Sequence, residues 1–356
     1  MIYYGIAAIF PLIMWFIHDY VVRVNRLDEK AKKKLTWKLT LMAILPMFLL
    51  FVFRDKSIGA DTIGYVRFFQ KDIRTYSFAQ LFDQDLVRME IGFRLYVKII
   101  SLFTDNYTVY FFVNGAVLFG SLLRFSLKYT KNPFVFFFLF ITLGTYAFFE
   151  TGLRQALAMV ICLWSIDFIK KKKIIPFILL VFIAYFFHKS AIAFMLVYPL
   201  SMIRKYDWMA FLYAILAVVF TVGFAFFQEL FNQLLGYEYE IEETGNGGIF
   251  MLFVLILFVY SSLMNYGKKG DEKAENAILH LSFLTVIFWL LRLISRTAER
   301  MSFYFMFGLY GYFAQAIGVD RDKVSSLLKW LLILACMVLF IYRNTATAYQ
   351  FFWGAV

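Results

Sequence analysis

Ionisable side chains lie at the edges of long apolar stretches, where few charged groups are expected. Arg154 follows a hydrophobic run that ends at Glu150, and His188 interrupts the apolar run from Ile174 to Ile203. A charge at the depth of a bilayer costs roughly 2.5–3.5 kcal/mol on insertion scales, so such a group marks a candidate functional site. A guanidinium group binds phosphate oxygens as a bidentate fork, which makes an anionic ligand the first chemistry to consider.

Three further arginines close another hydrophobic stretch at intervals of four residues. Arg292, Arg296 and Arg300 would drift only about 40° per step on a helix of 3.6 residues per turn. If the helix continues through Arg300, they form one cationic stripe that descends into the bilayer. Glu299 is the expected local counter-ion, and the outermost Arg300 could instead extend its charge to the membrane surface.

The segment that follows residue 53 combines an Arg54-Asp55 pair with a glycine-bearing turn and then Asp61-Thr62. Asp61 and Thr62 predict the N-cap of a short helix. Helix N-termini and arginine forks both suit phosphate oxygens. A salt-bridged loop in the headgroup region would explain the same residues equally well.

Simpler structural interpretations also exist for the first two candidates. Glu150 and Arg154 are four residues apart, so they could form an ion pair along one helical face. A single histidine such as His188 is often only a hydrogen-bonding core residue. The apolar segments on either side of His188 are short, however, and this favours a broken helical hairpin whose tip lines a cavity.

The composition predicts an all-α polytopic membrane protein. The chain has 356 residues, of which 62% are hydrophobic, and its mean hydropathy is +0.71. A soluble domain is nearer 45–50% apolar. Apolar runs of roughly 17–25 residues recur along the chain, as spanning helices require. The net charge of +12 lies largely in short loops between these runs, which indicates the positive-inside pattern and argues against nucleic acid as a partner.

Hydropathy and loop charge together predict about twelve spans in a single integral membrane domain, residues 1–356. Lysine-rich loops, including Lys170–Lys173, are assigned to the cytoplasm, which places both termini outside. The segment Gly92–Phe103 is then an interfacial or re-entrant helix within a long outer segment, because a full span there would reverse every later loop. The predicted spans are about 2–22, 38–53, 106–125, 133–149, 152–169, 174–187, 190–203, 208–228, 249–266, 277–295, 301–318 and 327–343.

This topology brings the candidate residues to one face of the membrane. An arginine-rich cavity within lipid suits an anionic, lipid-linked ligand, and a polyprenyl pyrophosphate fits best. No zinc-ligand spacing, nucleotide-binding glycine loop or serine elbow is present, so neither a metal nor a cofactor is expected. The residues assigned to the outer face are Arg54, Glu150, Arg154, His188, Arg292, Arg296 and Arg300.

Four short motifs in a fixed order resemble the EpsG family, the Wzy-like polymerases of bacterial exopolysaccharide, capsule or O-antigen. The resemblance covers about residues 50–310. It implies a membrane glycosyltransferase of the bacterial cytoplasmic membrane that moves a growing glycan from undecaprenyl pyrophosphate to a new lipid-linked repeat unit. A chain-length regulator and a flippase are the further partners it suggests. The motifs are Phe53-Arg54-Asp55 with Gly59-Ala60-Asp61-Thr62-Ile63-Gly64-Tyr65, Gly152-Leu153-Arg154-Gln155-Ala156-Leu157-Ala158, Phe187-His188-Lys189-Ser190-Ala191, and Arg296 with Glu299-Arg300.

The corresponding hypothesis assigns the donor pyrophosphate to arginines and the acceptor hydroxyl to a general base. Arg154, Arg296 and Arg300 would bind the pyrophosphate, with Arg54 and Arg292 in support. His188 is the first choice for the base; Asp61, Asp55 and Glu150 are alternatives.

The same residues are compatible with three other functions. A flippase or exporter would bind the same lipid-linked sugar without chemistry. A membrane O-acyltransferase acting on glycans would use His188 as its central catalyst. An O-antigen ligase would deliver a finished glycan to another acceptor by nearly the same chemistry.

Overall fold

The computed structural model describes residues 2–83, 88–203, 247–265, 272–293, 297–318, 322–344 and 348–354, with a few single positions between 215 and 233. The regular elements in these ranges are helices, and Arg54 and Phe351 form an isolated antiparallel bridge. The predicted all-α class is therefore confirmed.

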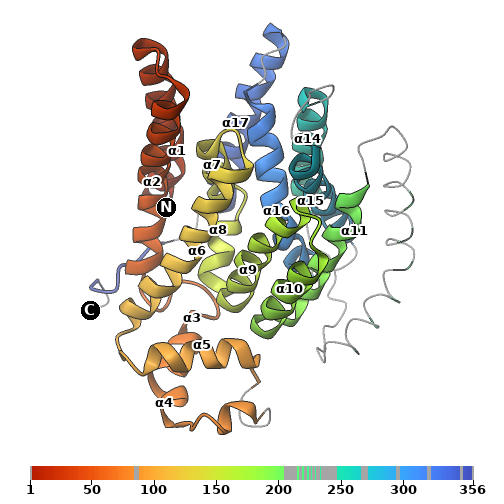
Figure 1. Cartoon of the computed structure of the whole chain (residues 1–356). Coiled ribbons are helices and arrows are strands. Elements are labelled where there is room, and N and C mark those ends of the chain that lie inside the picture. The colour runs from red at the N-terminus through yellow and green to blue at the C-terminus, as the bar shows by residue number, and fades with distance from the viewer. Residues whose placement is uncertain are drawn as a thin grey trace.

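Long apolar helices form the body of the molecule (Figure 1). Among the helices that the structure describes, five are long and apolar enough to cross a membrane. The helices α7 and α8, which meet at a bend of 60°, would together make a sixth span. The chain is a multi-pass membrane protein. These helices are α1 (Ile2–Asn25), α2 (Glu29–Phe53), α6 (Tyr107–Tyr129), α14 (Gly248–Asn265), α17 (Lys323–Asn344) and the bent pair α7 (Pro133–Thr142) and α8 (Thr145–Thr151).

Five or six spans are fewer than the twelve predicted. Other predicted spans are helical, but they are shorter or carry more charge: α10 has only 14 residues, and α9 contains Arg154, Asp167 and Lys170. The predicted span 208–228 and the acidic loop after it lie almost wholly outside the described residues. The remaining helices are α9 (Leu153–Lys170), α10 (Ile174–Phe187), η3 (Lys189–Leu196), α11 (Val197–Met202), α15 (Glu272–Leu291) and α16 (Thr297–Ala316).

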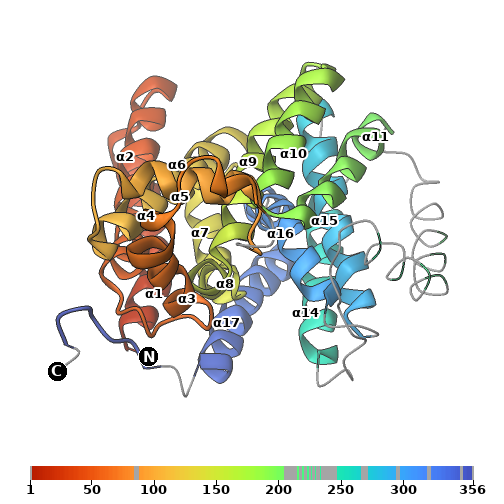
Figure 2. The ribbon, with the colours of Figure 1, turned by 90° about the horizontal axis from the view of Figure 1, so that it is seen from below.

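Short helices between α2 and α6 lie together at the bottom of Figure 1, on the side of α1 and α6 and away from α14 (Figure 2). With 11 residues, α5 is too short to span a bilayer, as predicted. The buried Lys98 of α5 donates to the carbonyls of Ile73 (3.0 Å) and Tyr76 (2.6 Å), which fastens the segment together. These helices are α3 (Thr62–Arg67), η1 (Phe68–Asp72), α4 (Ile73–Thr75), η2 (Gln80–Phe82) and α5 (Ile91–Ser101).

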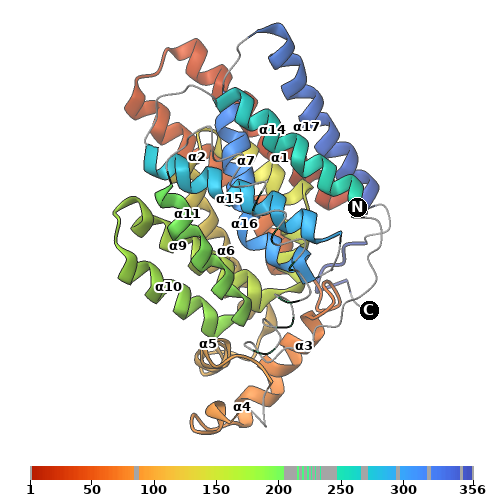
Figure 3. The same ribbon diagram turned by 90° about the vertical axis from the view of Figure 1, so that its right-hand side faces the viewer.

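The segment 348–354 returns to the end of α2 beside the start of α1. The Asp55 amide donates to the Gln350 carbonyl (2.9 Å), and the Phe352 amide donates to that of Phe53 (3.0 Å). The rings of Tyr3 and Tyr349 are 5.7 Å apart. Figure 3 shows the start of α1 and the segment 348–354 on the side opposite the turns that join α1 to α2 and α9 to α10. The lysine-rich turns therefore lie at the end of the bundle opposite the start of α1.

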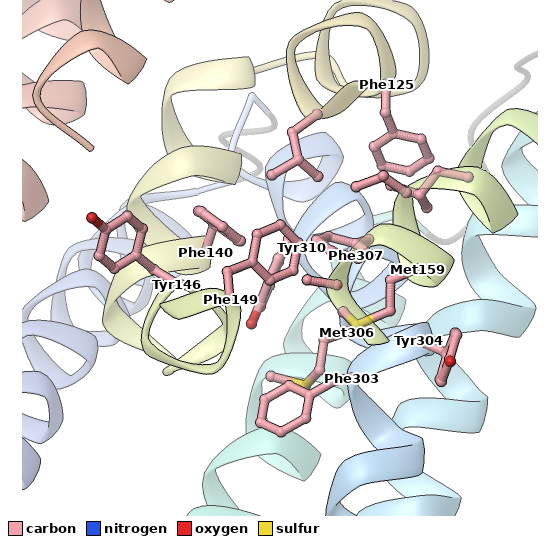
Figure 4. Close-up of a cluster of buried hydrophobic side chains, with 14 of the residues drawn as sticks. Phe125, Phe140, Tyr146, Phe149, Met159, Phe303, Tyr304, Met306, Phe307 and Tyr310 are labelled. Atoms are coloured by element: carbon pink, nitrogen blue, oxygen red, sulfur yellow. The ribbon is translucent and has the colours of Figure 1, made fainter. Parts of the chain in front are cut away.

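Aromatic packing around α7 forms the centre of the core. All ten residues of α7 are buried, and Phe140 contacts the rings of Phe149 and Phe307 (Figure 4). Thr145 and Tyr310 form a buried hydroxyl–hydroxyl hydrogen bond of 2.6 Å. Gly308 lets α16 approach α15 closely, because a Cβ atom there would lie only 2.1 Å from the Cβ atom of Leu281.

Candidate functional site

A buried carboxylate, Glu90, joins two of the candidate residues. Its Oε2 accepts from Arg154 Nη1 at 2.5 Å, and its Oε1 lies 3.0 Å from His188 Nδ1. Glu90 is 9% exposed and His188 is 7% exposed, whereas the Arg154 side chain is 24% exposed. Three segments far apart in the sequence therefore contribute to one charged cluster, hereafter the Glu90 cluster, which consists of Glu90, Arg154 and His188.

A close contact between α5 and α10 places Glu90 beside His188. Glu90 is the N-cap residue of α5, and Gly92 follows in the first turn. A Cβ atom on Gly92 would lie only 2.7 Å from the carbonyl oxygen of Phe186, near the end of α10. Only glycine permits this approach without a shift of the backbone, because it has no Cβ.

His188 lies where the chain leaves one helix and enters another. Its backbone is extended (φ −159°, ψ 120°), so α10 ends at Phe187 and η3 begins at Lys189. The predicted break at His188 is confirmed. The amide of His188 still donates to the Ala184 carbonyl (3.0 Å), and its own carbonyl accepts from Ala191 (3.0 Å), which fixes the junction.

The predicted ion pair between Glu150 and Arg154 is wrong. Gly152 interrupts the helix between them, with α8 ending at Thr151 and α9 beginning at Leu153, so the two side chains do not share a helical face. Arg154 pairs with Glu90 instead, and Glu150 Oε2 accepts a hydrogen bond from the Tyr4 hydroxyl at 2.9 Å.

Arg54 belongs to a second, aromatic-lined cluster. It is 1% exposed, and its guanidinium carbon lies 4.0 Å from the Phe51 ring centre and 4.3 Å from that of Phe111. Its Nη1 donates to the Phe51 carbonyl at 3.2 Å. The Tyr146 hydroxyl, which lies near Glu150, donates to the Met47 carbonyl at 3.0 Å. The structure thus encloses Arg54 and Glu150 beneath the surface, so binding of pyrophosphate by Arg54 stays a prediction.

The three arginines do not form one continuous stripe. The helix α15 ends at Leu291 and α16 begins at Thr297, which separates Arg292 from Arg300, and Arg296 lies outside the described residues. The predicted counter-ion is confirmed, since Arg292 Nε donates to Glu299 Oε2 at 2.7 Å.

A backbone contact links the start of α16 to α9. Gln155 Nε2, next to Arg154, donates to the Arg300 carbonyl at 2.6 Å. Arg300 is exposed, and it lies close enough to His188 for the charges of the two side chains to interact. Arg300 is therefore near the Glu90 cluster, as the hypothesis requires.

The acidic alternatives to His188 have different surroundings. Asp61 is the N-cap residue of α3, as predicted, but it is exposed and makes no capping hydrogen bond. Its neighbour Thr62 donates to the Glu150 carbonyl at 2.8 Å and so anchors α3. Asp55 accepts from the Ser57 amide at 2.9 Å. Burial raises the pKa of Asp55, but the hydrogen bonds from Ser57 outweigh it and hold the pKa below its ordinary value.

Sequence reasoning missed Glu90, the residue on which the cluster depends. It precedes the amphipathic segment that the sequence identified as non-spanning, and a carboxylate at that boundary was the available signal. Two hydroxyl groups were missed as well: Ser190 and Tyr304, 3.1 Å apart, connect η3 to α16 next to the same junction.

The candidate residues that the structure describes thus gather at one end of a helical membrane protein, with a histidine, a carboxylate and an arginine in direct contact. This arrangement defines a polytopic membrane protein with a charged site at the end opposite its lysine-rich turns. The sequence profile of the EpsG family matches residues 37–353, and the chain belongs to this family. Neither a characterised protein nor a solved structure matches it.

Proposed function

We propose that this chain polymerises lipid-linked oligosaccharide repeat units at the outer face of the bacterial cytoplasmic membrane. It would transfer the growing glycan from undecaprenyl pyrophosphate to a new lipid-linked repeat. Membership of the EpsG family supports a role in polysaccharide biosynthesis. The observation that carries the proposal is the contact of Glu90 with both His188 and Arg154, which supports a role for the histidine as a base beside an arginine that binds phosphate.

In the proposed step, His188 is the general base. Glu90 Oε1 would accept a hydrogen bond from Nδ1–H of His188, which puts the lone pair of the neutral ring on Nε2, the atom that would take the proton. The acceptor hydroxyl loses its proton to Nε2 as its oxygen forms a bond to the anomeric carbon of the donor. The bond from that carbon to the phosphate oxygen breaks, and undecaprenyl pyrophosphate leaves with the electron pair. No metal or nucleotide enters this balance.

The arginines would stabilise the charge that develops on the leaving group. Arg154 already donates to Glu90, which orients its guanidinium, and its side chain is partly exposed. Arg300 is exposed nearby, and Arg296 precedes it in the sequence. Arg54 and Arg292 lie deeper and would act by their field rather than by contact. Preorganised donors of this kind are often the largest single contribution to catalysis.

The charge asymmetry between the two ends of the bundle supports the proposed orientation. The lysine-rich turns would face the cytoplasm under the positive-inside rule, and the Glu90 cluster would then face outward with both termini. The finer topology of about twelve spans would count α9, α10, α15 and α16 as short or charged spans packed within the bundle.

Polymer formation by the purified full-length protein tests the proposal. Synthetic undecaprenyl-pyrophosphate repeats are supplied in detergent, and products are separated by size. A ladder of carrier-linked repeats is the expected result, and it should disappear with His188→Ala. A single capped product would indicate a ligase. Movement of the substrate across a vesicle membrane without a new glycosidic bond would indicate a flippase. Incorporation of an acyl group would indicate an acyltransferase.

A further inference from the structure

A hollow of about 390 Å³ opens between α2 and α6 at the lysine-rich end, far from the Glu90 cluster. A Cβ atom on Gly120 would meet nothing within 4 Å, so this glycine leaves open space in the groove. The groove, hereafter the α2–α6 groove, is lined by Trp37, Gly120, Leu123, Arg124, Leu127 and Lys128.

Two basic side chains border the groove and are held in place by α9. Lys128 Nζ lies 2.7 Å from Asp167, which also pairs with Arg124. The Arg124 guanidinium carbon lies 4.0 Å from the ring centre of Trp164. One carboxylate faces two cations, so the rim carries a net positive charge. The side chains of Arg124 and Lys128 are 27% and 44% exposed, which leaves both reachable by a ligand.

The aromatic residues place this rim at headgroup depth. Trp37 is 49% exposed and Trp164 is 44% exposed. Tryptophan is enriched where hydrocarbon meets the polar headgroups. The turns that follow α1 and α9 bring many lysines to the same end of the bundle.

An apolar track leads from the groove toward the middle of the bundle. Leu41 and Leu45 follow Trp37 on α2 at intervals of four, and Val117 precedes Gly120 on α6. These three side chains are 46%, 49% and 39% exposed, so they face outward from the bundle rather than into its core. A basic rim above an apolar track is complementary to a phosphate head with acyl chains beneath it.

We propose that the α2–α6 groove is a binding site for an anionic phospholipid such as phosphatidylglycerol. Arg124 and Lys128 bind the phosphate, Trp37 lies against the glycerol region, and the acyl chains run past Gly120 toward Leu45. The site is separate from the proposed polymerase chemistry and does not depend on it.

Native mass spectrometry of the full-length protein, released from detergent with equal amounts of phosphatidylglycerol and phosphatidylcholine, tests the site. We expect a preference for phosphatidylglycerol of roughly fivefold, the factor for one net basic charge near an anionic phosphate. The double variant Arg124→Gln/Lys128→Gln should abolish the preference, and Lys172→Gln/Lys173→Gln, exposed in the turn after α9 and outside the groove, should keep it.

A second variant tests the groove without changing its charge. Gly120→Leu fills open space and should reduce phosphatidylglycerol retention severalfold, whereas Gly5→Leu, which also meets nothing within 4 Å, should not. Equal retention of the two lipids by the wild type, or unchanged retention in both groove variants, would overturn the proposal. Displacement of the lipid by an equal concentration of glycerol phosphate would also overturn it, because the apolar track would then contribute nothing.

Discussion

Replacing Glu90 by glutamine should slow catalysis strongly while leaving the fold in place. The substitution keeps the size of the side chain but exchanges one carboxylate oxygen for an NH₂ group. Arginine has only donors, so the amide oxygen must face Arg154 and the NH₂ must face His188. His188 Nδ1 then has to accept, which places the ring proton on Nε2, where the proposed base needs a lone pair.

The magnitude follows from the step that is lost. General-base catalysis contributes about 10²–10⁴ in rate, which corresponds to roughly 2.7–5.4 kcal/mol of transition-state stabilisation. Glu90→Gln should therefore lower kcat for polymer formation by about two to four orders of magnitude. Binding of the lipid-linked donor should change less, because Arg154 keeps an acceptor for its hydrogen bond.

The assay is the initial rate of polymer formation at saturating lipid-linked repeat, with thermal unfolding in the same detergent as a check of folding. Glu29→Gln is the matched control, since Glu29 is 81% exposed and lies on α2 at the opposite end of the bundle. A folded Glu90→Gln protein that polymerises within about threefold of the wild-type rate would refute the assignment of His188, because a general base contributes far more than that.

Three further substitutions test the site and its supports. Arg154→Lys should lower the polymerisation rate by roughly one to two orders of magnitude, because lysine lacks the bidentate fork, and near-normal product ladders would remove its assigned role. Gly92→Ala should lower both the rate and the free energy of unfolding, the latter by about 1–3 kcal/mol, since the new methyl group overlaps a carbonyl of α10; Gly64→Ala, which meets nothing within 4 Å, should do neither in the same assays. Tyr4→Phe should cost about 1–3 kcal/mol in stability because the buried Glu150 loses its donor, and an unchanged unfolding temperature would show that this contact contributes little.

The sequence was informative about the helices because burial in lipid leaves a strong local signal. Uninterrupted apolar runs located α1 and α6 within a few residues, and they located the end of α2, which begins nine residues before the predicted start at Lys38. The first turns of α2 are rich in lysine, so hydropathy underestimated the length of this helix, which starts in the polar region. Elsewhere the predicted spans correspond to helices that are short or charged, such as α9 and α10, because hydropathy cannot tell a lipid-facing helix from one buried by its neighbours.

The local sequence could not predict which charged residues pair with one another. Glu90 lies 64 positions from Arg154 and 98 from His188, so no periodicity connects them. The expected Glu150–Arg154 pair assumed a continuous helix, and a single glycine between them was enough to separate their faces. The sequence did identify Arg154 and His188 as candidates, because each stands out against an apolar background.

The pairing of residues 350–352 with the end of α2 imposes an order on biogenesis. Tyr349 donates to the Leu50 carbonyl from 299 positions further along the chain. While the ribosome is still producing the intervening helices, the Leu50 carbonyl does not yet have this hydrogen bond, and the region around the Arg54 guanidinium is incomplete. Insertion of the first helices can thus proceed early, but maturation of this region has to follow synthesis through at least Phe352. A chain arrested before that point would be integrated in the membrane yet incompletely assembled.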